Sequence, residues 1–535
     1  MTPQDLCNAF YAVDNVLTVR ITMAPADWAA LKDAEPRGGF CNFAFTGERF
    51  DWFHATSVEL SGTAFPAGGP HTFTDVGISK KSFCGSFSKT KPSLRLNFSR
   101  FTDHEDAIEA LIGTQYVTLH NSVQDASYIR QPLGYELFRV AGMPYSRCNI
   151  ARVIVNGEEQ GAYVNCEPVR KRHIQNTFGN DEGNLYEIEA GEDLTEAMVT
   201  AGRLTHQGFS DVEDGSDLLL AAQRIAAGPA AAAEVVYLPS FQRFYAMETL
   251  LKHWDGYTGN ANNAYVYNDV VPIPNPDVAH VHLKFIPWGL DQILQPTTAF
   301  NLDDDCVLAR LVRQDPTLLA GVRAQITDLL HTVFSRDSIE TVVLPYIARL
   351  EAALATAGAT VPASEIETVR DQVRLIRSGG LLLTDIPSDR AMALLERGSL
   401  QCAHASQSET IGQHQEVYHH ALTSSRSDRW FIRGLATGSE LVNEKFGTFL
   451  HASTQILTAG GNPNVYAFRF TPSDGNVFVI TPQDVESPFK LSGYLTLRAV
   501  QSGMFVRFST TDLTGAGNPQ VHLAPPDQAT RLRLY

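Results

Sequence analysis

The chain has 535 residues, 44% of them hydrophobic, and this length predicts roughly two to four domains with sizeable cores. Its formal net charge of −17 argues against a general nucleic-acid binder, because such proteins hold the phosphate backbone with an excess of Lys and Arg. No apolar run reaches about 18 residues and no export signal opens the sequence, so we expect no membrane span and, for the sequence as written, a cytoplasmic location.

The seven cysteines lie at positions 7, 41, 84, 148, 166, 306 and 402 and form no CxxC pair. This spacing argues against structural zinc, and an odd number gives no complete disulfide framework. We therefore expect mostly reduced, buried thiols. If the sequence were a trimmed form of a longer protein, a secreted or surface-associated location would apply instead.

Residues 1–170 predict a β-rich small lobe. Apolar and polar residues alternate between positions 16 and 101, with Gly and Pro between the runs, as in a series of hairpins. Residues 121–142 have the spacing of a helix, and residues 148–169 predict two strands around an Asn-Gly turn.

Residues 171–404 predict a helical large lobe that also contains a hairpin. A helix is expected over residues 240–252, followed by strands over 262–269 and 280–288 that a Pro-rich loop joins. Residues 304–399 are expected to be helical almost throughout.

Residues 405–535 predict a separate all-β domain, because short alternating runs recur with turn signals between them. A repeated Gly-aromatic-Leu pattern, at 447–450 and 493–495, favours a β-trefoil, with a sandwich as the alternative. We expect this domain to recognise a protein or glycan ligand. Its aromatic residues are typical of a core, so no binding residue is assigned.

The segment from His253 to Asp291 contains the residue types that phosphoryl transfer requires. That reaction needs a carboxylate beside the attacking hydroxyl, an amide oxygen and a second carboxylate on Mg²⁺, and a cation on the upstream phosphates. Asp255 is expected to orient or deprotonate the acceptor hydroxyl, while His253 braces the loop. Asn260 or Asn263 would supply one metal ligand and Asp291, after an apolar strand, another. Ordinary Asp-Gly and Gly-Asn turns are the alternative explanation.

The cation is expected from one of four small-lobe lysines, and the alternation does not select among Lys80, Lys81, Lys89 and Lys91. A solvated basic sheet edge is the alternative. Glu136, in the predicted helix, is expected either to pair with that lysine or to be a surface charge. No GxSxG elbow, P-loop or GxGxxG motif is present, which argues against α/β-hydrolase and Rossmann enzymes.

Several blocks of the sequence, in one order, resemble the CotH kinase family, which is named for a spore-coat protein kinase. They span most of residues 15–400 and comprise 76–98, 117–147, 153–169, 184–187, 255–267 and 285–291. The resemblance implies an α+β fold of the atypical bilobal kinase type, here followed by the all-β domain. It also implies ATP and Mg²⁺ or Mn²⁺ as cofactors and a protein as substrate.

For the nucleotide, the resemblance assigns the lysine to Lys91, while Lys81 and Glu136 remain candidates for the same cofactor. Glu167 looks like the glutamate that the family places beside the nucleotide base.

For the reaction, the resemblance assigns the catalytic aspartate to Asp255 and the metal aspartate to Asp291. The loop asparagine is Asn263, with Asn260 as the competing choice. Family members commonly read PWDxD, whereas Gly289 stands here in place of the first aspartate, so one carboxylate is present where two are usual.

The expected function is therefore phosphorylation of Ser or Thr side chains on a protein. A kinase-like fold also permits AMP transfer or ATP-driven glutamylation, because a fold does not dictate its reaction. A degenerate kinase fold that serves as a scaffold or binding protein is the third alternative.

Overall fold

The structure is a computed structural model that describes most of the chain. Its described residues are 1–535 without 46, 64, 66–68, 82, 208–214, 270–280, 385–390, 398, 400, 412–413, 424, 436–437, 446–448, 459, 461, 469–476, 485–486, 488 and 515–517. The backbone but not the side chain is described at 391, 407–411, 414–415, 433–435, 438, 440, 442, 449, 454–457, 463, 466, 468, 477 and 513.

The described residues divide into two compact units. The first comprises Met1–Gln295, Leu302–Gln325 and Asp337–Arg370, and the second comprises Pro296–Asn301, Ile326–Arg336 and Asp371–Tyr535. The mixture of helices and strands confirms an α+β protein.

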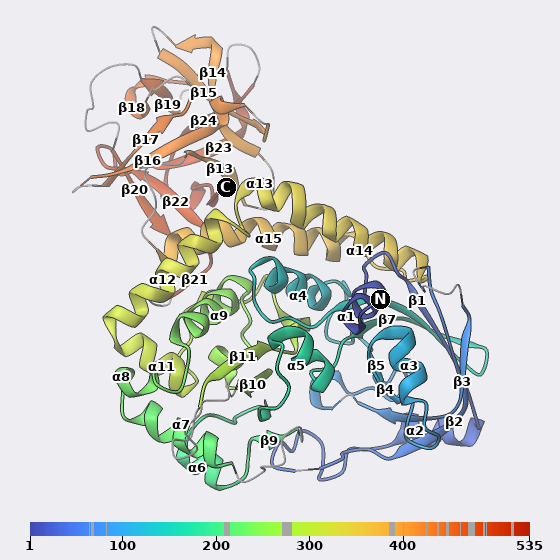
Figure 1. Ribbon diagram of the computed structural model, residues 1–535. Helices are drawn as coiled ribbons and strands as arrows, with labels where there is room; N and C mark the ends of the chain where they lie inside the picture. The colour runs from blue at the N-terminus through green and yellow to red at the C-terminus, as the bar shows by residue number, and fades with distance from the viewer. Residues whose placement is uncertain are drawn as a thin grey trace. The chain divides into compact units, whose positions relative to one another are not determined.

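Strands of the N-terminal part of the first unit form a closed barrel, in the order β1-β2-β3-β4-β5-β7-β6 (Figure 1). Alternate side chains of these strands, such as Val19, Val58 and Leu96, form its buried core. Antiparallel pairs make up the sheet, except that β1 and β6 pair in parallel and so close it. The strands are β1 (Leu17–Met23), β2 (Trp52–Ser61), β3 (His71–Lys80), β4 (Leu94–Asn97), β5 (Tyr116–His120), β6 (Cys148–Val155) and β7 (Glu158–Cys166).

The predicted hairpin around Asn156 and Gly157 is confirmed, since both residues have positive φ and join β6 to β7. The helix predicted over 121–142 begins later, as α4 (Arg130–Val140). This part of the chain also contains three helices that the sequence pattern did not predict: α1 (Pro3–Phe10), α2 (Pro25–Asp33) and α3 (Glu105–Ile112).

A disulfide joins Cys41 to Cys84, with a Cα separation of 4.6 Å. The expectation of reduced thiols is therefore wrong for this pair, whereas the other five cysteines are free and buried. The bond links the loop before β2 to the turn η1 (Cys84–Ser86), 43 residues along the chain. No local spacing rule could announce a pairing that depends on the closure of the barrel.

A second sheet has the strand order β11-β10-β8-β9. Helix α9 packs against it, with the Phe241 and Phe285 ring centroids 5.0 Å apart. Both predicted hairpin strands are present, with Ala264 opposite Pro287, but the Pro-rich connection lies outside the described residues. The elements here are α5 (Lys171–Phe178), β8 (Leu185–Ile188), α6 (Glu196–Thr200), β9 (Thr205–His206), α7 (Ser216–Ala226), α8 (Pro229–Ala232), α9 (Leu238–Leu251), α10 (Tyr257–Asn260), β10 (Ala264–Asn268) and β11 (Leu283–Pro287).

The predicted helical region is confirmed as far as Leu383. Its elements are α11 (Val307–Gln314), α12 (Pro316–His331), α13 (Arg336–Ser338), η3 (Ile339–Val343), α14 (Leu344–Thr356) and α15 (Ala363–Leu383). Residues 391–396 form strand β13 instead of helix, because they pair with β14, β16 and β25. None of the described helices is long and apolar enough to cross a membrane.

The second unit contains an antiparallel sheet in the order β14-β13-β16-β17-β18-β19-β15-β24-β23-β22-β20, with β25 paired to β13 and β22. Trp430 is fully buried in it and its indole N–H donates to the Ala403 carbonyl at 3.1 Å. The Gly residue of the 447–450 repeat lies outside the described residues. In this unit β12 and β21 pair with each other in a separate two-stranded sheet. The strands of the unit are β12 (Phe300–Asn301), β13 (Ala391–Glu396), β14 (Gln401–Ile411), β15 (His414–Ala421), β16 (Arg429–Leu435), β17 (Gly438–Asn443), β18 (Phe449–Leu457), β19 (Pro463–Phe468), β20 (Val477–Pro482), β21 (Lys490–Leu491), β22 (Leu495–Ala499), β23 (Phe505–Leu513), β24 (Pro519–Ala524) and β25 (Leu532–Leu534).

Candidate active site

The loop that carries Asp255 is fixed by the end of helix α9. Lys252 takes the left-handed conformation and ends the helix. One turn earlier, the buried Glu248 carboxylate accepts hydrogen bonds from the backbone N–H of Tyr257 at 3.1 Å and of Thr258 at 2.9 Å, and from the Thr258 hydroxyl at 2.6 Å. These donors belong to the first turn of α10, whose free N–H groups need acceptors. Glu248 therefore holds the loop between the two helices.

Three asparagine amides converge on the Asp255 carboxylate. The Nδ2 groups of Asn260 and Asn262 donate to Oδ1 at 2.7 and 3.0 Å, and Nδ2 of Asn263 donates to Oδ2 at 3.0 Å. Asn263 also donates to the Asp255 carbonyl at 2.9 Å. Each amide thus turns its nitrogen toward the carboxylate, which leaves its oxygen available as a ligand for a hard cation.

His253 ties this loop to the turn that follows β11. Its Nδ1 lies 3.3 Å from Oε1 of Glu248, and its Nε2 lies 3.3 Å from the carbonyl oxygen of Gly289. Burial alone would lower the pKa of His253, but the carboxylates of Glu248 and Asp255 outweigh it and raise that pKa. The ring therefore contacts both the end of α9 and the turn after β11, which is the bracing position expected for this residue.

The loop and the turn also meet at Asn263 and Gly289. The Trp288 N–H donates to the Asn263 carbonyl at 3.0 Å. Gly289 has φ +58, and a Cβ at this position would lie 2.2 Å from Oδ1 of Asn263. The amide oxygen of Asn263 is therefore directed at Gly289.

Asp291 follows in the short turn η2 (Leu290–Gln292). Burial, followed by the negative charges of Asp125 and Asp255, raises the pKa of Asp291 to about 7. Asp125 itself is buried in an ion pair with Arg130 at 2.5 Å. The negative charge of Asp255 thus reaches Asp291, and a divalent cation bound at Asp291 would offset this repulsion.

A cleft of about 480 Å³ opens within the first unit, and Trp288, the residue before Gly289, lines it. Asp255, Asn260, Asn263 and Asp291 are not among its lining residues. Among its lining residues are Lys81, Glu187, Tyr265 and Trp288. Lys81 places its ammonium 5.2 Å above the Trp288 ring. Burial lowers the pKa of Lys81, and the charges of Glu187 and Asp291 oppose that change. Lys81 therefore lines the cleft and also interacts electrostatically with Asp291.

Lys91, the lysine favoured by the resemblance, is placed elsewhere. Its ammonium donates to the Tyr128 hydroxyl at 2.8 Å and to the Ala162 carbonyl at 2.7 Å, and burial lowers its pKa to about 8. It does not belong to the described lining of the cleft, whereas Lys80 and Lys81 do. The Lys80 ammonium is already bonded to the carbonyls of Lys32 and Ala34, at 2.9 and 3.1 Å. The assignment to Lys91 stays a prediction, and the geometry favours Lys81.

The two glutamates predicted near the nucleotide also lie outside the cleft lining. Glu136 forms an ion pair with Arg139 on α4, with two contacts of 2.7 Å. Glu167 is buried against Arg147, at 2.8 and 2.9 Å, with His173 at 3.4 Å. Burial would raise the pKa of Glu167, but Arg147 and His173 lower it to about 2. The residues directly after Glu167, 168–170, do line the cleft.

Sequence reasoning assigned no role to three carboxylates that the structure brings to this region: Asp125, Glu187 and Glu248. Glu187 stood in one of the resembling blocks, yet a single acid in a strand gives no positional signal. Asp125 accepts from the Ser127 N–H and the Arg130 side chain, and an Asx-type turn of this kind is the local signal that was available.

A family model described as CotH kinase protein matches residues 82–377, which is more than half of the chain. No curated protein matches the sequence. Among solved structures, the designed 3-fold symmetric protein ThreeFoil is similar, with 17% identity over 27% of this chain and 96% of its own, at a TM-score of 0.22. The SDF2-like protein from Arabidopsis thaliana has 12% identity over 26% and 91%, at 0.24. The Macrolepiota procera ricin B-like lectin in complex with lactose has 10% identity over 28% and 98%, at 0.22. Similarity at this level carries no argument about the fold or function of this chain.

Proposed function

Because the chain belongs to the CotH kinase family, a family of kinase-like transferases, we propose that it uses ATP and Mg²⁺ or Mn²⁺ to phosphorylate Ser or Thr side chains of a protein. One observation supports this proposal most directly. The loop with Asp255 and Asn263 and the turn with Asp291 are held together by hydrogen bonds, and Trp288, just before that turn, lines a cleft that also contains Lys81.

In this proposal, Asp291 and the amide oxygen of Asn263 hold the divalent cation, which neutralises charge on the transferring phosphoryl group when it is bound. Lys81 contacts the upstream phosphates from the cleft. Asp255 accepts a hydrogen bond from the acceptor hydroxyl and orients it, because its carboxylate is itself fixed by three amide donors. Asn260 is the more exposed of the asparagines and the second choice as ligand.

A second candidate, a scaffold with a degenerate kinase fold, is supported by one residue. Gly289 offers no carboxylate where the family commonly has one, so the cation has fewer anionic ligands. AMP transfer and glutamylation share the same proposed site with the kinase reaction. They differ from it in how the nucleotide lies in the cleft and in the mass that the product gains.

Intact-mass analysis after incubation with ATP, Mg²⁺ and candidate protein substrates separates these possibilities. The proposal predicts a phosphate-sized increment that Asp291→Asn abolishes. Asp106→Asn, the same change at an exposed position on α3, should leave the increment intact. An AMP-sized or glutamate-sized increment would replace the kinase version. If no increment appears and no nucleotide raises the melting temperature, the scaffold stands.

A further inference from the structure

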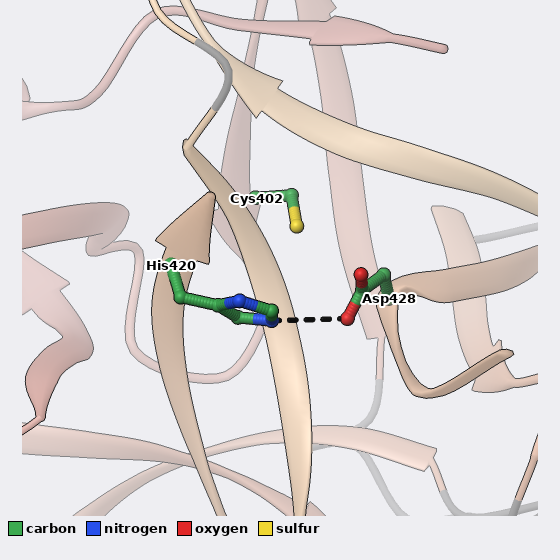
Figure 2. A group of neighbouring side chains, drawn as sticks. All are labelled: Cys402, His420 and Asp428. Atoms are coloured by element: carbon green, nitrogen blue, oxygen red, sulfur yellow. Dashed lines mark hydrogen bonds and ion pairs between the residues drawn. The ribbon is translucent and has the colours of Figure 1, made fainter. Parts of the chain in front are cut away.

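A cluster of metal-binding side chains lies in the second unit, in residues that the proposed kinase reaction does not use. Figure 2 shows Cys402, His420 and Asp428 directed toward one another. Cys402 on β14 and His420 on β15 are direct cross-strand partners in the antiparallel register. Such partners lie on the same face of the sheet. Asp428 joins them from the end of the short helix η4 (Arg426–Asp428), which precedes β16.

The donor atoms of this cluster are close enough to share one ion. The sulfur of Cys402, a ring nitrogen of His420 and a carboxylate oxygen of Asp428 all lie within 4.8 Å of one another. Nε2 of His420 is 3.1 Å from Oδ1 of Asp428. In a tetrahedral zinc site, bonds of about 2.0–2.3 Å place ligand atoms roughly 3.3–3.8 Å apart, so only small side-chain movements separate this arrangement from coordination.

The carboxylate is held in place by groups outside the cluster. Oδ2 of Asp428 accepts from the Thr423 N–H at 3.0 Å and the Thr423 hydroxyl at 2.7 Å. Its other oxygen, Oδ1, is thereby directed at His420 and also at His404, whose Nδ1 lies 2.6 Å away. Partners that fix a ligand from behind are a regular feature of metal sites.

Burial distinguishes this cluster from a group of surface side chains. Cys402 and Asp428 have no exposed side-chain surface, and the side chain of His420 is 29% exposed. Cys402 and Asp428 therefore shield an ion at this site from solvent, while the partly exposed His420 leaves a path by which an ion can enter. A water molecule can take the fourth position, which a tetrahedral ion requires.

We propose that Cys402, His420 and Asp428 form a zinc-binding site, with His404 as an orienting partner of the carboxylate. Sulfur and imidazole ligands favour zinc and disfavour Mg²⁺, which prefers oxygen ligands alone. On binding, the Cys402 thiol loses its proton to solvent and the thiolate becomes the ligand. The ion fastens η4 to the β14–β15 pair and is independent of the nucleotide cleft. The absence of a CxxC motif is no objection, because the strand pairing brings the ligands together.

Cobalt titration of the chelator-treated full chain tests this site. No reductant is added, so Cys41 and Cys84 stay paired. We expect a thiolate-to-cobalt charge-transfer band that zinc abolishes, and about one zinc ion retained per chain after dialysis. Cobalt in the kinase site would give no such band, since the proposed ligands there are oxygen atoms. A missing band in the native chain would overturn the proposal.

Two cysteine variants assign the band. Cys402→Ser should remove it, whereas Cys306→Ser should keep it, because Cys306 caps α11 in the first unit. A band that survives Cys402→Ser, or one that Cys306→Ser removes, would contradict the site. If Cys402→Ser does not fold, zinc X-ray absorption of the native chain decides, with one sulfur ligand per zinc at about 2.3 Å expected. A zinc shell of oxygen and nitrogen only would overturn the proposal.

Discussion

Replacing Gly289 by Asp should weaken this protein, although it restores a carboxylate that the family commonly has. Gly289 has φ +58, a conformation that costs an ordinary L residue about 1–2 kcal/mol. The new Cβ would also lie 2.2 Å from Oδ1 and 2.4 Å from Cγ of Asn263, so Asn263 must move.

Movement of Asn263 would break its hydrogen bonds to the carbonyl and the carboxylate of Asp255. A hydrogen bond to a charged group contributes about 1.5–3 kcal/mol, so strain and lost bonding together predict a loss of about 2–5 kcal/mol in the free energy of unfolding. ATP-dependent transfer should fall as well, because Asp255 and Asn263 lose their mutual orientation.

Two alanine variants separate the contributions. Gly358→Ala meets a positive φ of 74° with nothing within 4 Å of the new Cβ, so it should lose only the backbone strain, about 1 kcal/mol. Gly289→Ala adds the collision without the charge. Urea unfolding followed by tryptophan fluorescence gives the free energies, and phosphate incorporation gives the activity. A Gly289→Asp variant that is as stable as Gly358→Ala would contradict this prediction. So would a Gly289→Asp variant that transfers phosphate faster than the native chain.

Four further results are expected. Lys81→Met should reduce ATP-dependent transfer by roughly 100-fold, as the loss of one preorganised charge does. Lys91→Met should mainly lower stability, because it removes the ammonium that donates to the Ala162 carbonyl. Equal rate losses in the two variants, at unchanged stability, would return the nucleotide role to Lys91. The pKa of Asp291 is raised to about 7, so the folded chain retains a proton that the unfolded chain releases near the usual carboxyl pKa of 3.8. This group should therefore lower the metal-free stability as pH rises across that window, and Asp291→Asn should remove the trend in urea midpoints. The same pKa predicts tighter Mg²⁺ binding as pH rises through about 7. Glu167→Gln should lower the free energy of unfolding in urea by about 3–5 kcal/mol, because Arg147 would stay buried without its carboxylate partner. Glu159→Gln, in an exposed ion pair, should cause no measurable change. Similar losses in the two variants would refute the role given to burial.

The sequence was most informative where the site is local. Asp255 and Asn263 lie in the loop after α9 and Asp291 follows the hairpin strand β11, so their spacing and the strand pattern were enough to predict that these two segments are neighbours. Their proximity follows from the pairing of β10 with β11, which period-2 alternation announces. The roles of these residues remain predictions that the proposed variants test.

The parts that could not be predicted depend on closure over long sequence separations. Lys80, Lys81, Lys89 and Lys91 share one polar segment, and only the curvature of the barrel decides that Lys80 and Lys81 line the cleft while Lys91 turns to Tyr128. The Cys41–Cys84 bond has the same origin. Glu187 acquires its place beside Lys81 from the pairing of β8 with β10, in a different sheet.

The parallel pairing of β1 with β6 also decides where a fragment of the kinase-family region can begin. The family match begins at residue 82, yet β1, β2 and β3 precede it and complete the barrel. A truncated chain that starts at that boundary would leave β4 and β6 with open edges and uncover the apolar side chains that Val19, Val58 and Ile78 cover. Unpaired strand edges of this kind promote self-association. A soluble catalytic fragment should therefore keep the residues from β1 onward.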